Sequence, residues 1–182
     1  SLSNEAAGPM VHEIFPDGCV SLFHHRNELT GTKQAAFTGL NTTSISTLVS
    51  PGDVFWGMRI SPAACAAILR TDVSSLCGRR LIPAGEFPHL TSETTELLGS
   101  AENFGDAIAV FERGLEQAGV SNADADPVAV AALSFIEDRA AEFKISDVAA
   151  HTGVGVRQFE RRFKAASGLT PKQYTRIRRL RA

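Results

Sequence analysis

The chain has 182 residues, of which 43% are hydrophobic and 21% charged, with a formal net charge of −2. This composition is typical of a globular protein with a real core and excludes fibrous and intrinsically disordered classes. No run of about 18 apolar residues and no basic-then-apolar leader occurs, so we expect a cytoplasmic protein without membrane contact. Cys19, Cys65 and Cys77 have no paired spacing, which argues against a disulfide framework or a zinc knuckle.

Opposite charges divide the chain into two parts. Residues 1–125 contain 7 Lys and Arg against 14 Asp and Glu, and residues 126–182 contain 11 against 6, so the parts carry −7 and +5. This change of sign indicates two domains, with the basic one facing a polyanion. The polar stretch 119–127 is the expected linker, which places an N-terminal domain at 3–119 and a C-terminal domain at 126–182.

The first domain is predicted to contain strands followed by helices. The segment 12–25 indicates two strands around the turn Pro16-Asp17-Gly18, and the turn Pro51-Gly52-Asp53 separates two later ones. A helix is expected to follow, with Ser61 as its N-cap, and then one or two more helices over 93–119. We therefore expect an α+β fold, a small β-barrel-like domain with helices at one side. The further strands are expected at 35–40, 45–50 and 54–60.

The second domain is predicted to be all-α. Its first helix begins at the Asp126-Pro127 pair, an N-cap followed by proline, and packs through Ala129, Leu133 and Ile136. A short helix with Ser146 as N-cap then runs to about His151. Gly168 ends the next helix, and a Thr170–Gln173 capping box with Pro171 opens the last one, which turns Tyr174 and Ile177 inward.

The short helix and the one after it are predicted to form a helix-turn-helix. Gly153 supplies the left-handed residue of the turn, and Ala149 is small where the two helices approach. The second helix covers about 155–166. The side chains at the helical spacing of one buried face are Val156, Phe159, Phe163 and Ala166, with Val148 and Val154 filling the space between the helices.

The opposite face of this helix indicates DNA recognition. In a helix-turn-helix the second helix enters the major groove, and arginine can pair with guanine while glutamate accepts from cytosine. Arg157, Glu160 and Arg161 are the predicted base-contacting residues. The predicted phosphate-contacting residues are Gln158, Lys164, Lys172, Arg176 and Arg179.

The segment ISDVAAHTGVGVRQFERRFKAASGLTPKQYTRIRRLRA resembles the first helix-turn-helix of AraC-type bacterial transcription regulators. The resemblance covers the chain from Asp126 onward, and in that family the positions of Arg157, Glu160 and Arg161 face base edges. Gly155 departs from the usual serine-like cap. A second departure is that the family has a second helix-turn-helix, which is absent from this sequence, so we expect either a fragment, the favoured interpretation, or an unusual protein with a single helix-turn-helix. The implied function is a sequence-specific, double-stranded-DNA-binding transcription regulator.

The stretches FPDGCVSLFHH and GDVFWGMRISP are similar to an N-terminal domain that precedes this unit in some such regulators. In the family the first domain generally senses a ligand, mediates dimerisation, or both. The resemblance therefore implies an unidentified small-molecule effector, a homodimer, or both. We expect no cofactor.

Other functions are weighed against this interpretation. A metal site would use His24, His25 and Glu28, but adjacent histidines on a strand point to opposite faces. Cys19 beside its turn is a candidate redox-sensing thiol, whereas Cys65 is expected in a helix core. Trp56, Phe55 and Met58 could line an apolar pocket, although strand core is the safer interpretation.

No catalytic constellation is found, so an enzyme is not expected. The alternative of a different class is a regulatory module whose basic helices bind a protein, without independent DNA binding.

Overall fold

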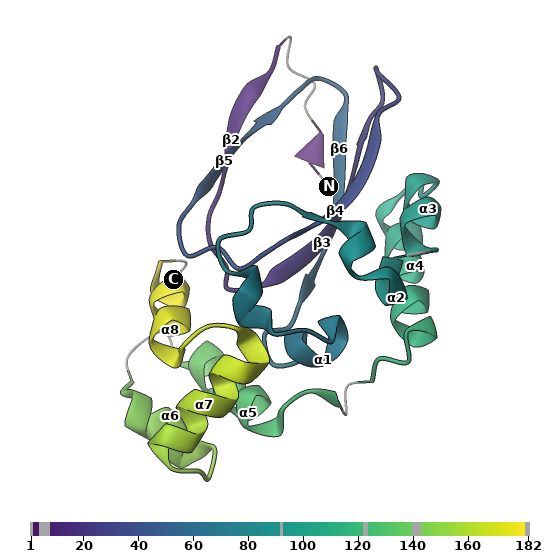
Figure 1. Ribbon diagram of the computed structural model, residues 1–182. Helices are drawn as coiled ribbons and strands as arrows, with labels where there is room; N and C mark the ends of the chain where they lie inside the picture. Colours follow the sequence, from purple (N-terminus) through teal and green to yellow (C-terminus); the bar gives the residue numbers. More distant parts are fainter. Residues whose placement is uncertain (1, 4–7, 92, 122–123, 140–142, 181–182) are drawn as a thin grey trace.

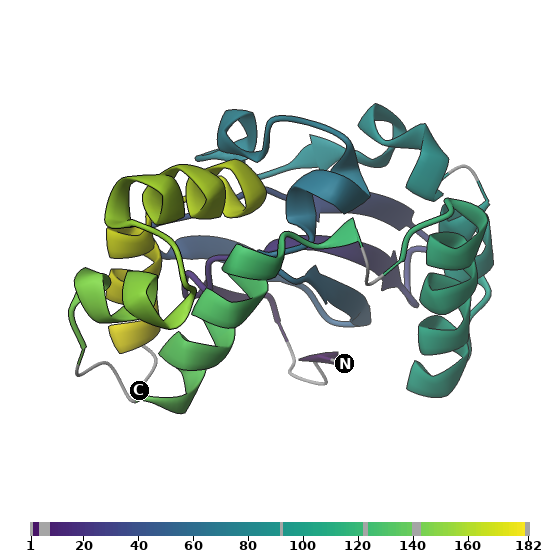
Figure 2. The same ribbon diagram turned by 90° about the horizontal axis from the view of Figure 1, so that it is seen from below.

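The computed structural model describes residues 2–3, 8–91, 93–121, 124–139 and 143–180. The expected linker residues 122–123 and Arg181 of the last helix lie outside this part of the chain. Figure 1 shows the strands together at one end of the molecule and four helices, α5 to α8, at the other. Figure 2, seen from below, places α6, α7 and α8 on one side and α3 and α4 on the other. Among the described residues, no helix is long and apolar enough to span a membrane.

The strands form two antiparallel sheets, which confirms a β-rich first part. The larger sheet has the order β1-β6-β3-β4-β7, and a separate two-stranded sheet pairs β2 with β5. The larger sheet contains β1 (Leu2–Ser3), β3 (Val20–Asn27), β4 (Lys33–Thr38), β6 (Asp53–Ile60) and β7 (Ile82–Pro83), and the smaller one β2 (Met10–Ile14) and β5 (Ile45–Val49).

Strand alternation decides which face of the larger sheet is covered. Along β3, Val20, Leu22 and His24 are buried while the residues between them are less so, as expected for side chains that alternate between faces. Helices then cover this face, and both α3 and α4 contact it. The helices and 3₁₀ turns of this part are α1 (Cys65–Leu69), η1 (Val73–Leu76), η2 (Ala84–Glu86), α2 (Pro88–Thr91), α3 (Thr94–Gly99) and α4 (Phe104–Gln117).

The second part is all helical, as predicted, and most of its start and stop signals are confirmed. Asp126 accepts hydrogen bonds from the N–H groups of Val128 and Ala129 and so caps α5. Gly168 ends α7 in the left-handed conformation, with φ 76°, and Thr170 and Gln173 cap α8 reciprocally. The four helices are α5 (Pro127–Asp138), α6 (Ile145–His151), α7 (Val156–Ser167) and α8 (Pro171–Arg179).

Two predicted N-caps are wrong. Helix α1 begins after Ala64, not after Ser61, because the residues between them form a turn in which the Ala64 N–H donates to the Ser61 carbonyl. Helix α6 begins after Lys144 and takes Ser146 into its first turn. Lys144 is the N-cap residue, and its backbone N–H donates at 2.9 Å to the carboxylate of Asp147, the third residue of the helix.

The two parts share one hydrophobic core through α7 and the residues after it. Helix α7 packs against α1 and η1. A Cβ at Gly168 would lie 2.5 Å from Leu40 and 2.9 Å from the Val73 backbone, and one at Gly18 would lie 2.8 Å from the Tyr174 ring. Glycine is thus required at both contact points, by close approach as well as by positive φ.

We predict that Gly168→Ala destabilises the protein far more than Gly153→Ala. Both glycines have φ above 70°, but a Cβ at Gly153 would meet nothing within 4 Å. The left-handed strain common to both is roughly 1–2 kcal/mol, and forced overpacking adds about 1–3 kcal/mol at Gly168 alone. Urea unfolding of both variants measures the difference. Equal losses of unfolding free energy in the two variants would contradict close packing between the end of α7 and the first part.

Candidate nucleic-acid interface

The helix-turn-helix is built by α6, a four-residue turn and α7. The turn begins at Thr152, whose hydroxyl donates to the Ala149 carbonyl at 2.8 Å. Gly153 follows with φ 71°, a conformation that most side chains avoid, and its N–H donates to the Ala150 carbonyl. Gly155 then precedes α7 without a side-chain cap. The predicted turn and its glycine are confirmed.

One face of α7 is fully buried. Phe159 and Phe163 are both 0% exposed, with ring centroids 5.7 Å apart, and Phe163 also meets Tyr174 at 5.6 Å. Truncating a buried phenylalanine typically costs about 3–5 kcal/mol, so these rings largely determine where the helix sits. The expectation that Val156 shares this face is wrong. Its side chain is 43% exposed because α7 begins at this residue, one turn outside the packed region.

An ion pair holds α7 against the start of α5. The Arg162 guanidinium donates from Nε to Asp126 Oδ2 at 2.9 Å, and its Nη2 lies 2.9 Å from the same oxygen. The other carboxylate oxygen of Asp126 caps α5. The backbone N–H of Asp126 donates to the carbonyl of Ala63, just before α1. Partly exposed pairs contribute only about 0–1 kcal/mol. The pair therefore orients a helix whose position the phenylalanines already determine.

This role of Arg162 was not predicted from the sequence. The residue follows Arg161 in a basic run, and only its helical angle, between the buried and exposed faces, sets it apart. The Asp126 carboxylate was recognised as a cap, but capping uses one of its oxygens and leaves the other free for a partner 36 residues away.

The three predicted base-contacting side chains share the outer face of α7. Arg157, Glu160 and Arg161 are all exposed. No ion pair joins them to another described residue. Their charged groups are consequently available to an external ligand, as base reading in a groove requires.

The predicted phosphate-contacting side chains extend this surface onto α8. Lys164 differs from the others because it lies near the first part of the chain. The Ser74 hydroxyl and N–H hold the pKa of Asp72 below its ordinary value, and the charge of Lys164 lowers it further. Lys164 thus lies near enough to Asp72 to act on its charge. All five residues of the predicted set are exposed: Gln158, Lys164, Lys172, Arg176 and Arg179.

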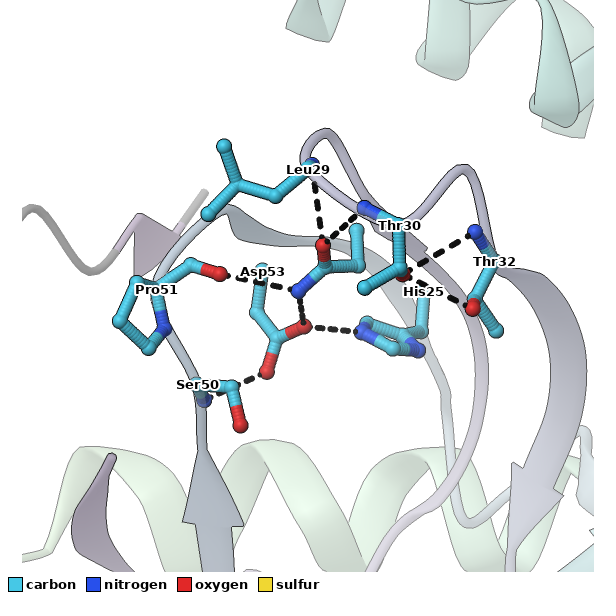
Figure 3. A network of polar contacts seen from close by, with 8 residues as sticks. His25, Leu29, Thr30, Thr32, Ser50, Pro51 and Asp53 are labelled. Atoms are coloured by element: carbon cyan, nitrogen blue, oxygen red, sulfur yellow. Dashed lines mark hydrogen bonds and ion pairs between the residues drawn. The ribbon is translucent and has the colours of Figure 1, made fainter. Parts of the chain in front are cut away.

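The histidines suspected of metal binding lie on opposite faces of β3. His24 is buried, whereas His25 Nε2 lies 2.7 Å from Asp53 Oδ1 in a polar network that Figure 3 shows. Asn27 donates to the same oxygen, also at 2.7 Å, and the Ser50 N–H donates to the other one. Among the described residues, no group of three or more His, Cys, Asp or Glu could hold a metal. Asn27 Oδ1 also accepts from two N–H groups of the loop that follows β3. The network therefore joins this loop to the turn that precedes β6.

The cysteines differ strongly in environment. Cys65 is 1% exposed, and burial raises the pKa of its thiol to about 12, which confirms the prediction of a small apolar core residue. Cys77 is exposed at the contact with the second part, where its thiol lies 3.7 Å from the Gly168 carbonyl. Cys19 is half-buried beside its turn.

Two family models match the chain. Residues 137–176 match "Bacterial regulatory helix-turn-helix proteins, AraC family", which confirms the resemblance expected from the sequence. Residues 1–81 match a domain of unknown function (DUF6597). No curated protein matches the chain.

Among solved structures, the chain is similar to unsaturated-fatty-acid-bound ToxT from Vibrio cholerae, at 13% identity and a TM-score of 0.30, over 97% of this chain and 98% of that one. An apo variant of the same protein gives 12%, 0.27, 97% and 99%. At this level of similarity neither structure adds to what the present fold shows.

We predict that the Asp53 network adds acid-sensitive stability. Burial opposes the ionisation of Asp53, but hydrogen bonds from Asn27, His25 and Ser50 outweigh it and hold its pKa below the ordinary 3.8. The stability that this shift contributes is present above pH 3.8 and is lost as the pH falls through the lower pKa of the folded protein.

Asp53→Asn should therefore cost about 1–3 kcal/mol at pH 7, because at least one donor loses its acceptor. Urea unfolding from pH 7 to pH 3 checks this, with Asp138→Asn as the control at an exposed carboxylate outside the network. A variant as stable as the parent at pH 7 would contradict the role of the network.

Proposed function

Residues 137–176 match the model of AraC-family bacterial regulatory helix-turn-helix proteins, and from this premise we propose that the chain reads DNA sequence with the exposed face of α7. Arg157, Glu160 and Arg161 contact base edges in the major groove. The basic side chains of α7 and α8 contact phosphates on either side. The protein regulates transcription by this binding.

One observation carries the proposal: the same helix has an uncharged buried face and an exposed face with two free arginines. Phe159 and Phe163 fix α7 to its own domain, so Arg157 and Arg161 project from a rigid support. Rigid support matters because an arginine can pair with guanine in two hydrogen bonds only from a defined position.

The charge of the second part supports a polyanionic partner. From Gly155 to the last residue there are nine basic side chains and one acidic one, Glu160. An apolar protein-binding surface would instead contain several large hydrophobic side chains in solvent. On α7, Val156 is the one large hydrophobic residue that is exposed. This favours DNA over the alternative of a protein-interaction module.

The first part is proposed to regulate this reader by effector sensing or dimerisation. Its sheet and α7 belong to one hydrophobic core, so a change of side-chain packing in the first part alters the contacts of α7. The two-stranded sheet also leaves apolar side chains in solvent, and such patches often mark contacts between protein molecules. We propose a second copy of the chain as the partner of these residues, which are Met10, Val11, Ile14, Phe15 and Leu48.

We predict that Arg161→Ala relaxes recognition at one base position. Selection from a random duplex pool with the parent protein first defines a site. The variant should then bind that site with about 1–3 kcal/mol less free energy and accept other bases at a single position. Arg113→Ala, which removes an exposed arginine from α4, is the matched control. It should change neither the binding free energy nor the base preference.

An equal loss on every sequence would show that Arg161 contacts phosphate instead. If the parent enriches no sequence from the pool, even at low salt, the proposed reading of bases fails.

A further inference from the structure

Asp126 lies where the first part of the chain ends, and its polar groups join three separate elements. Its backbone N–H donates at 3.1 Å to the carbonyl of Ala63, just before α1. Carboxylate Oδ1 accepts from N–H groups in the first turn of α5, and Oδ2 accepts from Arg162 of α7. Helix α7 contacts both α1 and α5, and the three helices lie together in Figure 1. Asp126 therefore connects the first part directly to the helix that carries the predicted base-contacting residues.

Hydrophobic packing and the ion pair restrain α7 in different ways. Phe159 and Phe163 are fully buried, but the burial of apolar surface is non-directional. Hydrogen bonds have preferred distances and angles. Two nitrogens of the planar Arg162 guanidinium lie 2.9 Å from one oxygen of Asp126, and Nε donates to it. The rings thus set how deeply α7 is buried, and the ion pair restrains its rotation about its own axis.

Small rotations of α7 matter for reading bases. The side chains of an α-helix reach a radius of about 5–6 Å, so a rotation of roughly 10° displaces them by about 1 Å. N–H···O hydrogen-bond distances vary over only about 0.5 Å. Arg161 directly precedes Arg162 in the helix, and a bidentate contact between Arg161 and guanine would not survive such a displacement.

We propose that Asp126 is a positioning residue for DNA reading. Through Arg162 it holds α7 in the orientation in which Arg157 and Arg161 meet base edges, without contacting DNA itself. The inference rests on the proposed function. It goes beyond that function by placing a determinant of base preference outside residues 137–176, the segment that matches the helix-turn-helix family.

Asp126→Asn and Arg162→Gln test the proposal because they change the charge in opposite directions. Asparagine is as good an N-cap as aspartate, so Asp126→Asn keeps the start of α5 while it removes the carboxylate from Arg162. If the two residues acted on DNA through charge alone, Asp126→Asn would strengthen binding to every duplex and Arg162→Gln would weaken it.

A positioning role predicts the same change in both variants. The ratio of the affinity for a selected site to that for random duplex should fall by about two- to fivefold in each, the range expected for a partly exposed ion pair. The double variant should fall no further than the worse single variant, because both changes break one pair. A ratio that falls in only one single variant, or losses that add in the double variant, would overturn the positioning role.

Matched controls separate this effect from a general change of charge. Asp138→Asn and Arg113→Gln make the same changes at exposed residues of α5 and α4, and should keep the ratio of the parent. All variants should melt near the temperature of the parent, since a partly exposed pair contributes little to stability. A lower ratio then reports the orientation of α7 and not its unfolding.

NMR of the free protein separates this proposal from the proposed function, because it requires no DNA. The Nε–H signal of Arg162 should shift in Asp126→Asn and stay in place in Asp138→Asn. A signal that is the same in the parent and in Asp126→Asn would overturn the pair itself, whatever the protein binds. A parent in which the pair is present but which enriches no sequence from a duplex pool would instead contradict the proposed reading of DNA.

Discussion

The seating of α7 is the constraint on which both halves of the molecule depend. Phe159 and Phe163 fill the interior of the helical part, and the residues directly after the helix are wedged against Leu40 and Val73. The apolar contacts contribute several kcal/mol, and the Arg162–Asp126 pair far less. Position is therefore determined by packing, and orientation is refined by charge. A DNA-reading face needs both.

This arrangement also connects the sheet of the first part with α7 through continuous packing. The face of the sheet that contains His24 and Trp56 is covered by α3 and α4, while α7 meets α1 and η1 in the same continuous core. Close-packed interiors transmit small displacements because they have few voids to absorb them. The contacts at Gly18 and Gly168 leave no space for an added Cβ atom. A displacement in the first part would therefore be transmitted to α7 and α8 at these two contacts.

Local signals in the sequence predicted most of the helical part. Asp126-Pro127, Gly153, Gly168 and the Thr170–Gln173 box act within a few residues, so their effects could be inferred without knowing the fold. The longer strands were also predicted from local signals, the turn residues Pro16-Asp17-Gly18 and Pro51-Gly52-Asp53 between them. The strand β7 was missed because it forms only by pairing with the distant strand β4. The 3₁₀ turns η1 and η2 were missed because single turns held by local hydrogen bonds are too short to give a periodic pattern.

The candidate site was only partly predictable. Helical spacing placed Arg157 and Arg161 on an outer face, where the structure also has them. The same spacing misplaced Val156, since periodicity cannot show where packing stops. The partner of Arg162 could not be inferred, because the fold brings it from 36 positions away in the chain.

The most direct test of the account is the salt dependence of binding to a random duplex, for the parent and for the triple variant Arg157→Ala, Arg161→Ala, Lys164→Ala. The account predicts that log affinity falls steeply with log salt for the parent. In the variant the slope should drop by at least about 0.9, for the phosphate that Lys164 no longer neutralises, or binding should vanish. A parent that binds no DNA at low salt, or a variant with the parent's slope, would contradict the claim that α7 faces DNA.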